Sequence, residues 1–563
     1  MADPGGREQR LDLLVIGAGI TGVQIAREAA ARGRSVLVVD KGDLGSGTSS
    51  ATTKYLHGGI RYLEHYDVRV VRESLRERRI ATLSAPHLVR QTRFLLPVWR
   101  WSTPGRAALS AGAAVYDGLA FDRNRGAPAD LRIGHPRWLG RDAARRAVPW
   151  LDPCELRGAV AITDTLNVHP ERLLLEFALD AVRLGAEFRT YTRVTGFDTG
   201  TDIDTGTGTG DSDRLRVSGA RLRDELDGRE TTVRAERVVN AAGPWMGEVL
   251  ATLGRPVGPR VTPSKGVHLL TRRVDDGVTD AVMARARNGR HVVVSPWQGR
   301  VFIGPTDTPE AVTPDEVAAS STDVDELLAI VNSCRAPEAR LTTADVDDVT
   351  VGIRPLVSSP GADTYSASRR HEVYDHADEG FAGLWSVAGG KWTTGRAIAA
   401  DVVDRVLGAG RSPTARRPVP SAGDWGAEPS VLLGTAARLR PDLHLTREAA
   451  EHLSRLYGLR CGVVLDLIAA DPTLGERVSS RFGCHDVLAQ VVVAVRDEWA
   501  RSLSDIIDRR LVLGTLGPVT ADELARVAAV AAPLLGWADQ GRSMAAAEHA
   551  RRTARRRAWS GDR

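Results

Sequence analysis

The N-terminal part of the chain carries three glycines at fixed spacing between two apolar runs. Gly17, Gly19 and Gly22 follow directly on the run LDLLVI, and the helix-like segment VQIAREAAARG leads to a second run, SVLVVD, which ends in Asp40. In such a strand–helix–strand unit of about 30 residues, the glycines allow a tight turn, close approach of the backbone to a pyrophosphate, and close helix–strand packing. The helix N-terminus offers N–H groups to phosphates, and Asp40 is placed to bind a ribose hydroxyl. The sequence therefore predicts a dinucleotide-binding unit.

The composition is that of a soluble globular protein with several domains. The chain has 563 residues, of which 42% are hydrophobic, and its net charge of +4 is too small for a disordered chain. No stretch approaches the ~18 apolar residues of a membrane span, and the N-terminus has no signal-peptide core. Cys154, Cys334, Cys461 and Cys484 form no metal-binding or CxxC pattern, so we expect a reduced, cytoplasmic protein without disulfides or a metal site. No basic stripe interleaved with aromatic residues is present, which argues against nucleic acid as a partner.

A segment rich in small hydroxyl residues follows Asp40. From Gly45 to Lys54 it reads GSGTSSATTK, which is too rich in Ser, Thr and Gly for a packed helix or strand. Its N–H groups, hydroxyls and ammonium suit phosphates and the polar edge of a flavin, whereas the alternative is an ordinary Ser/Gly loop. The cluster HGGIRYLE follows at 57–64, and VVNAAGPW at 238–245 is typical of a buried strand that ends in a glycine turn. These neighbours favour a cofactor loop.

The middle and the C-terminal part of the chain differ in character. The polar, low-complexity segment 199–213 indicates a hairpin tip or surface insertion without a role in chemistry. The segments GVHLLT, HVVVSPW and VFIGPTD indicate strands of a β-rich domain. Beyond a Pro/Gly-rich connector, the periodicity predicts a separate helical domain. Its helices are expected over 446–457, 462–470, 487–508 and 520–535.

The basic residues of the chain are almost all arginines. Of the 75 lysines and arginines, only four are lysine: Lys41, Lys54, Lys265 and Lys391. Because an ammonium is a compact point charge and a guanidinium is a planar fork, these lysines mark positions where the ammonium itself is needed, unless they survive by compositional chance.

The C-terminus carries a basic cluster from Arg551 to Arg557, with Trp559 beside it. It is either a solvated helix end or tail, or a patch that meets an anionic membrane surface with the indole at the headgroup level.

Nine sequence blocks, in one order along nearly the whole chain, resemble those of the FAD-dependent glycerol-3-phosphate dehydrogenases, a family within the D-amino-acid-oxidase-like flavoproteins. Each block alone is common, but nine in order are highly specific, and three of the four lysines fall inside them. The blocks are GAGITG (17–22), TSSATTKYLHGGIRYLE (48–64), NAAGPW (240–245), KGVHL (265–269), IGPTDT (303–308), GIRPL (352–356), SRRH (368–371), GGKWTT (389–394) and VRDEWARSLSDIIDRR (495–510).

The resemblance implies a mixed α/β fold. It comprises a Rossmann-like two-dinucleotide-binding FAD domain, a β-rich substrate domain and a C-terminal all-α domain. The implied bounds are 11–410 for the interleaved FAD-binding and substrate domains, with FAD parts at about 11–90, 155–260 and 345–410, then a linker at 411–427, the helical domain at 428–545 and a basic tail at 546–563.

The resemblance also implies oxidation of sn-glycerol 3-phosphate to dihydroxyacetone phosphate, with hydride transfer from C2 to flavin N5 and electrons passed to a membrane quinone. The implied partners are glycerol 3-phosphate, the quinone and an anionic membrane surface, with the protein held peripherally at the inner face of the cell membrane. A homodimer is one assembly open to it. The alternative is an oxidase that uses O2 and produces hydrogen peroxide. An NAD-dependent dehydrogenase is disfavoured by the hydroxyl-rich loop, and a flavin-binding protein without turnover by the intact set of polar residues.

The residues implied to bind the substrate are mainly cations. Arg354 and Arg369 grip the phosphate, because a guanidinium meets a phosphate with bidentate geometry. Arg61 and Tyr62 face the substrate, and Lys391 reaches the substrate side of the flavin.

A base must take the proton of the C2 hydroxyl, and a histidine suits that task. His57 and His268 both lie in matching blocks, and His57 is slightly favoured because it adjoins the flavin loop. The implied catalytic set is therefore His57, His268, Arg61 and Lys391, with Thr306 and Asp307 orienting these groups. The helix after GGKWTT offers its N-terminus to the negative charge of the reduced flavin.

The implied FAD contacts are Gly17, Gly19, Ile20, Thr21, Gly22, Asp40, Lys41, Thr48, Ser49, Ser50, Thr53, Lys54, His57, Gly58, Gly59, Ala242, Gly243, Trp245, Gly390, Lys391, Thr393 and Thr394. Two positions depart from the family pattern. Gly395 stands where relatives usually carry Tyr, so looser packing under the flavin is expected. Asp40 stands where Glu is more usual, and its shorter reach is compatible with ribose binding.

Overall fold

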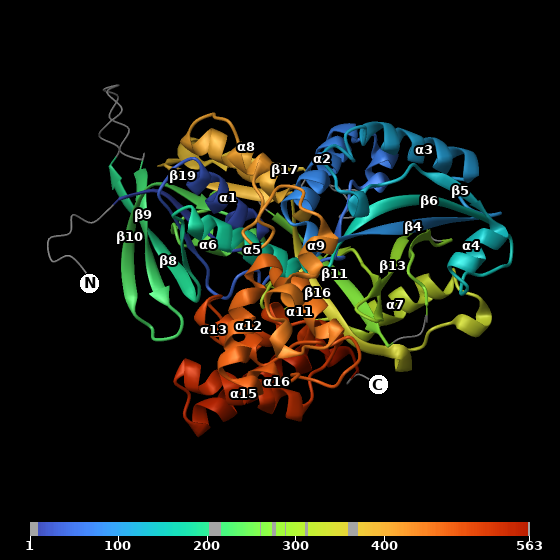
Figure 1. The fold of residues 1–563 in the computed structure, drawn as a ribbon. Helices are drawn as coiled ribbons and strands as arrows, with labels where there is room; N and C mark the ends of the chain where they lie inside the picture. Colours follow the sequence, from blue (N-terminus) through green and yellow to red (C-terminus); the bar gives the residue numbers. More distant parts are fainter. Residues whose placement is uncertain are drawn as a thin grey trace.

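The computed structural model describes residues 10–201, 215–258, 261–272, 277–287, 289–309, 313–357 and 370–560. These residues form two large sheets and a group of C-terminal helices. In Figure 1 one sheet lies to the left, the other to the right, and the C-terminal helices lie below both.

The first sheet contains the predicted dinucleotide-binding unit. Its strands are β1 (Leu11–Ile16), β2 (Val36–Val39), β7 (Glu187–Arg189), β8 (Thr192–Thr201), β9 (Leu215–Asp224), β10 (Glu230–Asn240), β17 (His371–Asp375), β18 (Phe381–Ala382) and β19 (Leu384–Gly389). The strands β19, β10, β1, β2 and β7 lie side by side and parallel. The register aligns Ile16 with Val39 and with Asn240. Because these strands end at one edge, Gly17 and Asp40 come together there.

Both faces of this sheet are covered, which is why its central strands read as unbroken apolar runs. Alternate residues of β1 and β2, such as Leu13 and Val38, pack against the helices α1 (Ile20–Ala31), α5 (Pro170–Arg183) and α8 (Gly395–Leu407). The intervening residues, such as Leu14 and Val39, pack against the β8–β9 strands and α6 (Met246–Ala251). Strands β8 and β9 are antiparallel partners on either side of the polar segment, as expected for a hairpin, but residues 202–214 lie outside the described ranges.

The second sheet is mostly antiparallel. Its strands are β3 (Tyr55–Leu56), β4 (Val89–Trp99), β5 (Arg137–Gly140), β6 (Leu156–Asn167), β11 (Val261–Thr271), β12 (Ala281–Arg285), β13 (His291–Trp297), β14 (Arg300–Gly304), β15 (Thr308–Pro309) and β16 (Val346–Val357). The three apolar segments predicted as strands are β11, β13 and β14, which confirms that prediction. In this second sheet β6 pairs with β4, and β16 pairs with β11. The sequence ranges 155–260 and 345–410, expected to belong to the FAD-binding domain, therefore each include one strand of the second sheet.

Helices lie along this second sheet and beyond it. They are α2 (Val68–Ser84), α3 (Arg106–Leu119), α4 (Arg141–Ala147) and α7 (Ser321–Asn332). Helix α7 shares the apolar core of the sheet, whereas α3 buries only Ala113 and Tyr116.

The C-terminal part is helical, as predicted. Its helices are α9 (Pro429–Leu433), α10 (Thr435–Leu439), α11 (Arg447–Tyr457), α12 (Cys461–Ala470), α13 (Ala489–Arg496), α14 (Leu503–Asp505), α15 (Ala521–Leu535) and α16 (Asp539–Arg556), with a π turn at Ile506–Arg510. The single helix expected over 487–508 is wrong. Trp499 takes a positive φ of 57°, and Ser502 starts a new helix with a capping box to Asp505, so the chain breaks between α13 and α14.

The connector at 411–427 is docked against helices α2 and α5. The N–H of Val419 donates to the carbonyl of Ser84 at 2.9 Å, and that of Gly426 donates to the carbonyl of Leu83 at 2.8 Å. Arg417 pairs with Asp180 of α5 at 2.8 Å.

The C-terminal basic residues continue α16, and the chain then turns into the second sheet. Trp559 is 4% exposed and belongs to that sheet's apolar core. The interpretation that placed this indole at a membrane surface is therefore wrong, because the core already buries it.

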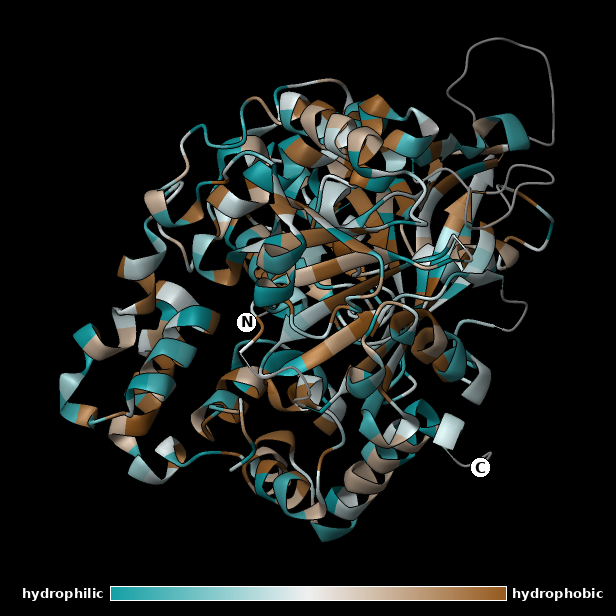
Figure 2. Ribbon diagram, turned by 90° about the vertical axis from the view of Figure 1, so that its right-hand side faces the viewer, coloured by the Kyte–Doolittle hydropathy of each residue, from teal (hydrophilic) through white to brown (hydrophobic). Residues whose placement is uncertain are grey.

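Hydropathy follows this architecture. Figure 2 shows brown, hydrophobic strands through the centre of the molecule and teal on many outer helices. Within the described ranges, none of the helices combines the length and the apolar character that a membrane span needs. The mixed α/β fold with a helical C-terminal part confirms the expected fold class.

Candidate active site

The turn after β1 brings backbone segments into very close approach. Gly17 has a φ of +104°, and a Cβ there would stand 2.7 Å from the carbonyl oxygen of Ala241. A Cβ on Gly22 in α1 would stand 1.9 Å from the carbonyl oxygen of Gly17. Only glycine fits at both positions, which is the geometric reason for the spacing seen in the sequence.

Asp40 lies beside this turn, at the end of β2. Its carboxylate accepts the N–H of Ala18 at 2.7 Å and the N–H of Gly42 at 2.8 Å. Burial raises the pKa of this carboxyl group. A carboxylate offers about four acceptor sites, so two remain for hydroxyl groups of a ligand.

A cavity of about 950 Å³ opens at this edge, and both sheets contribute to its wall. The residues expected to bind FAD that line it are Gly17, Gly19, Ile20, Thr21, Asp40, Lys41, Thr48, Ser49, Thr53, His57, Gly59, Ala242, Gly243, Trp245, Gly390, Lys391 and Thr393. Gly22, Ser50, Lys54, Gly58 and Thr394 lie outside this lining set.

The hydroxyl-rich loop is an ordered part of the cavity wall. Ser49 Oγ accepts the N–H of Ile20 at 2.9 Å and so caps the first turn of α1. Thr48 Oγ1 donates to the carbonyl of Ile353 at 2.5 Å, which ties the loop to β16. Ser50 Oγ donates back to the carbonyl of Gly45. Several of these hydroxyls therefore shape the loop itself.

The four lysines divide into two pairs. Lys41 and Lys391 line the cavity. Lys54 Nζ lies 2.6 Å from the carboxylate of Glu171, and Lys265 Nζ lies 2.9 Å from that of Asp323 at the N-terminus of α7. The ammonium groups of Lys54 and Lys265 thus stabilise buried carboxylates beside the cavity.

The two candidate histidines both line the cavity. Burial, with the charges of Lys391 and Arg61, lowers the pKa of His57 to about 3. His268 is 2% exposed, stacks on Phe302, and has no hydrogen-bond partner for either ring nitrogen among the described residues. Burial, with the charge of Arg354, lowers its pKa well below the ordinary value. Both imidazoles are therefore neutral at pH 7 and keep an unprotonated ring nitrogen, although the lowered pKa makes each a weaker base than an exposed histidine.

Four of the five expected substrate-binding residues line the cavity. Arg61, Tyr62, Arg354 and Lys391 all line it. Lys391 Nζ lies 4.5 Å from the ring centroid of Tyr62 and donates to Ser74 Oγ of α2. Arg369 lies outside the described residues.

Arg354 is held by the neighbouring strands. Its Nη2 donates to the carbonyl of Thr306 at 3.0 Å, and its Nη1 donates to Ser264 Oγ at 3.3 Å. These contacts fix one edge of the guanidinium to the second sheet and place the charge at the cavity wall.

Sequence reasoning missed several lining residues. Asp164 of β6 lines the cavity and pairs with buried Arg78 of α2, although neither lies in a recognised block. Asp505 and Arg509, from the C-terminal helices, also line it. Both residues belong to the family block 495–510, to which the sequence assigns no function. No local pattern in that block indicates that it lies beside the cavity.

Comparison with known proteins identifies the family. A model for FAD dependent oxidoreductases matches residues 12–405, and a model for the C-terminal domain of alpha-glycerophosphate oxidase matches 412–542. A glycerol-3-phosphate dehydrogenase of Synechocystis is 35% identical over 89% of this chain and 88% of its own. A mitochondrial glycerol-3-phosphate dehydrogenase of Mus musculus is 34% identical over 94% of this chain and 71% of its own. The chain belongs to the FAD-dependent glycerol-3-phosphate dehydrogenase family.

A solved structure supports the same assignment. The glycerol-3-phosphate dehydrogenase from Bacillus halodurans, complexed with FAD, is 26% identical, has a TM-score of 0.76, and matches 97% of this chain and 95% of that one. The expected family and the expected cofactor, FAD, are thereby confirmed. The residues present fit FAD, because a turn that only glycine can form, a carboxylate with free acceptor sites and a cavity of about 950 Å³ lie together.

The departure at Gly395 has a structural explanation. A Cβ at this position would stand 2.8 Å from Cγ1 of Ile20. Without a side chain, the first turn of α8 packs closely against the N-terminus of α1. This contact does not involve the flavin side of the turn, so the looser packing expected under the flavin stays a prediction.

Proposed function

We propose that this protein oxidises sn-glycerol 3-phosphate to dihydroxyacetone phosphate and passes the electrons to a membrane quinone. The observation that carries the proposal is that the cavity that fits FAD is lined by three cations, Arg61, Arg354 and Lys391, and by the neutral His57, which has Arg61 and Lys391 beside it. The names of the relatives at about 35% identity support the same substrate.

The residues divide the work between binding and proton transfer. Arg354, fixed by the carbonyl of Thr306, presents its charge to the phosphate dianion. FAD bound in the cavity supplies the hydride acceptor, flavin N5, for the hydrogen on C2. His57 accepts the proton of the C2 hydroxyl, because its imidazole is neutral and lies among cations that favour an oxyanion. His268 is the second candidate for this role.

An anaerobic titration of the purified protein with sn-glycerol 3-phosphate tests the reaction. We expect stoichiometric bleaching of the flavin absorbance. A yellow protein that glycerol 3-phosphate does not bleach would keep the cofactor but exclude this substrate, and sn-glycerol 1-phosphate serves as the stereochemical control.

The proposal of a membrane quinone as acceptor is supported by the outer face of α3. Val115 in α3 is 53% exposed, and Phe121, which follows the helix, is 75% exposed. After Arg106, the other exposed residues of α3 are all small, namely Ala107, Ala108, Ala111, Ala114 and Gly118. Arg106 stacks on Trp138 at one end of the helix, and Arg72 stacks on Phe121 at the other. An apolar face with basic ends suits an anionic bilayer surface. The protein would then lie peripherally at the cytoplasmic face of the cell membrane.

The acceptor is decided by comparing turnover with a soluble quinone and with O2. We expect the quinone to support much faster turnover than O2. Equal rates, with stoichiometric hydrogen peroxide, would make the protein an oxidase instead.

A further inference from the structure

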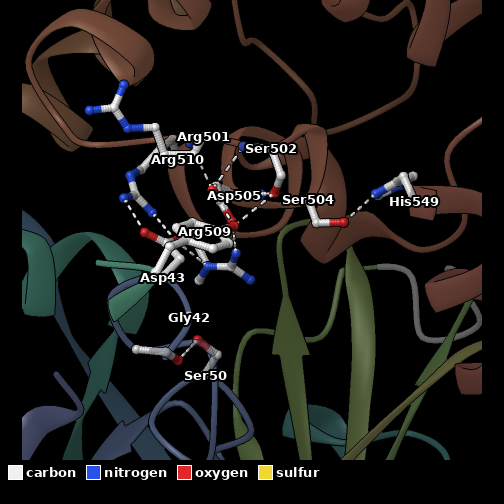
Figure 3. A network of polar contacts seen from close by, with 12 residues as sticks. Gly42, Asp43, Ser50, Arg501, Ser502, Ser504, Asp505, Arg509, Arg510 and His549 are labelled. Atoms are coloured by element: carbon white, nitrogen blue, oxygen red, sulfur yellow. Dashed lines mark hydrogen bonds and ion pairs between the residues drawn. The ribbon is translucent and has the colours of Figure 1, made fainter. Parts of the chain in front are cut away.

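A cluster of buried charges joins the C-terminal helices to Asp43, which lies just before the hydroxyl-rich loop (Figure 3). Arg509 Nε donates to Asp43 Oδ2 at 2.6 Å, and Arg510 donates to both oxygens of Asp43 at 2.6 and 2.8 Å. Arg509 also donates to Asp505 at 2.5 Å. The side chains of Asp43 and Asp505 are fully buried, and those of the two arginines are at most 5% exposed.

The two arginines that reach Asp43 are consecutive residues at the end of a π turn, Ile506–Arg510. In a regular helix, neighbouring side chains point about 100° apart. The π turn is rare in proteins as a whole, and those that occur are often found at functional sites. The wider turn follows the capped start of α14, where Asp505 accepts the N–H groups of Arg501 and Ser502. This local geometry is built around Asp43.

Asp43 belongs to the segment that begins with Asp40, the residue beside the glycine turn. Tyr191 holds the same segment from the other side, because its N–H donates to the carbonyl of Gly42 at 3.0 Å. The hydroxyl of Tyr191 donates to Asp505 at 2.8 Å. The loop from Asp40 to Asp43 is thus fixed on both sides by contacts that end on the helical turn around Asp505.

These residues also form part of the cavity wall. Asp43, Tyr191, Asp505 and Arg509 all line the cavity, together with Asp40. The C-terminal helices are therefore part of the wall of the cavity that fits FAD, although the glycine turn and Asp40 lie in a different part of the chain.

We propose that Arg509 is a positioning residue for FAD, which acts by fixing the Asp43 loop. It follows that docking of the C-terminal helices and binding of FAD favour one another. By thermodynamic linkage, docking of the C-terminal helices strengthens FAD binding by the same free energy by which bound FAD stabilises the docked helices. This inference rests on FAD as cofactor and is independent of the substrate and the acceptor proposed above.

The test compares two substitutions that each remove an arginine from a fully buried carboxylate which keeps a second arginine; the Arg509 side chain is 5% exposed and that of Arg460 is 21% exposed. Arg509→Gln leaves Asp43 paired with Arg510. The control, Arg460→Gln, removes another ion pair between the C-terminal helices and α5, and leaves its partner Glu176 paired with Arg172. Both variants are prepared as the full chain, stripped of FAD and titrated with FAD while flavin fluorescence is recorded. Hydrogen exchange over residues 489–510 is measured with and without FAD.

We expect Arg509→Gln to raise the Kd for FAD at least tenfold and to abolish the FAD-dependent protection of 489–510. We expect Arg460→Gln to change the Kd less than threefold and to keep that protection. An unchanged Kd in Arg509→Gln, or an equal loss in both variants, would overturn the proposal. If Arg509→Gln does not fold, Tyr191→Phe decides the matter. Loss of its bond to Asp505 should raise the Kd at least threefold, and an unchanged Kd would overturn the proposal.

Discussion

The hydroxyl of Tyr116 accepts the N–H of Gly58 at 3.0 Å and donates to Asp164 at 3.0 Å. Tyr116 lies on the inner side of α3, and Gly58 follows His57 directly. Asp164 pairs in turn with Arg78 of α2. One buried phenol therefore connects α3, a helix that buries only two of its residues, to the loop that carries the proposed base.

Tyr116→Phe should impair catalysis more than substrate binding. The N–H of Gly58 loses its acceptor, and a buried donor left unpaired costs about 1–3 kcal/mol, so the loop at His57 is destabilised. We expect kcat to fall about tenfold while KM changes less than threefold, which is the loss of about 1.4 kcal/mol in transition-state stabilisation. Steady-state kinetics check this result. Tyr66→Phe, at a residue 90% exposed, is the control, and an unchanged kcat in Tyr116→Phe would show that this connection does not position His57.

The glycine turn was predictable from sequence because its constraints are local. Gly17, Gly22 and Asp40 act within one strand–helix–strand unit, and the parallel register then brings them to one edge. The apolar strands were predictable for a similar reason, since burial on both faces leaves a continuous apolar run.

The use of each lysine was not predictable from sequence. Lys54 and Lys265 lie in recognised blocks as Lys391 does, yet they pair with Glu171 and Asp323. Those partners are distant in the chain and lie in no recognised block. A motif indicates that an ammonium is needed, and only the tertiary fold decides which carboxylate or cavity it meets.

The interface between the C-terminal helices and the cofactor loop was equally hidden. The contact between Asp43 and Arg509 depends on a break between α13 and α14 and on the π turn that follows. Helical periodicity across 487–508 gives no sign of either, because the apolar spacing continues through the break.

Arg354→Gln should weaken substrate binding and leave the cofactor in place. The substitution removes the cation that faces the cavity, while the contacts of Asp40 and the glycine turn are untouched. We expect KM for glycerol 3-phosphate to rise at least tenfold, with the flavin spectrum and FAD content unchanged. Arg526→Gln, at an exposed residue paired with Glu476, is the control. Unchanged kinetics in Arg354→Gln would remove this residue from the phosphate site.

His57→Asn should lower kcat far more than it changes FAD binding. Loss of a general base costs roughly 10²–10⁴-fold in rate. Since burial and the nearby cations lower the pKa of His57 to about 3, its imidazole should remain neutral from pH 8 down to pH 5. Histidine NMR of the free holoprotein, with His57→Asn to assign the signal, checks this. A signal that titrates near pH 6.5 would contradict the lowered pKa, and a larger loss of kcat in His268→Asn would contradict the assignment of His57 as the base.

His87 should make the protein less stable in mild acid. It is fully buried, and burial lowers its pKa to about 4. In the unfolded chain a histidine titrates near ~6.5. Between these values the unfolded state binds the extra proton, so the free energy of unfolding falls as pH decreases, by up to about 1.4 kcal/mol per pH unit. Denaturant unfolding at pH 7 and pH 5 should show a smaller difference in His87→Leu than in the wild type. Exposed His135→Gln should keep the wild-type difference, and an unchanged difference in His87→Leu would contradict the prediction.

Membrane attachment should depend on α3 and not on the C-terminal indole. A carboxylate in the exposed apolar face opposes contact with an anionic bilayer, so Val115→Glu should weaken binding to vesicles that contain anionic lipids at least tenfold, without changing the flavin spectrum. Trp559→Ala is the comparison variant. The indole of Trp559 is 4% exposed in the core of the second sheet, so its truncation should lower the free energy of unfolding by about 3–5 kcal/mol. At temperatures where Trp559→Ala remains folded, its vesicle binding should equal that of the wild type. Sedimentation with vesicles and thermal unfolding measure the two effects separately. Normal vesicle binding by Val115→Glu, or its loss in folded Trp559→Ala, would show that the membrane surface lies elsewhere than on α3.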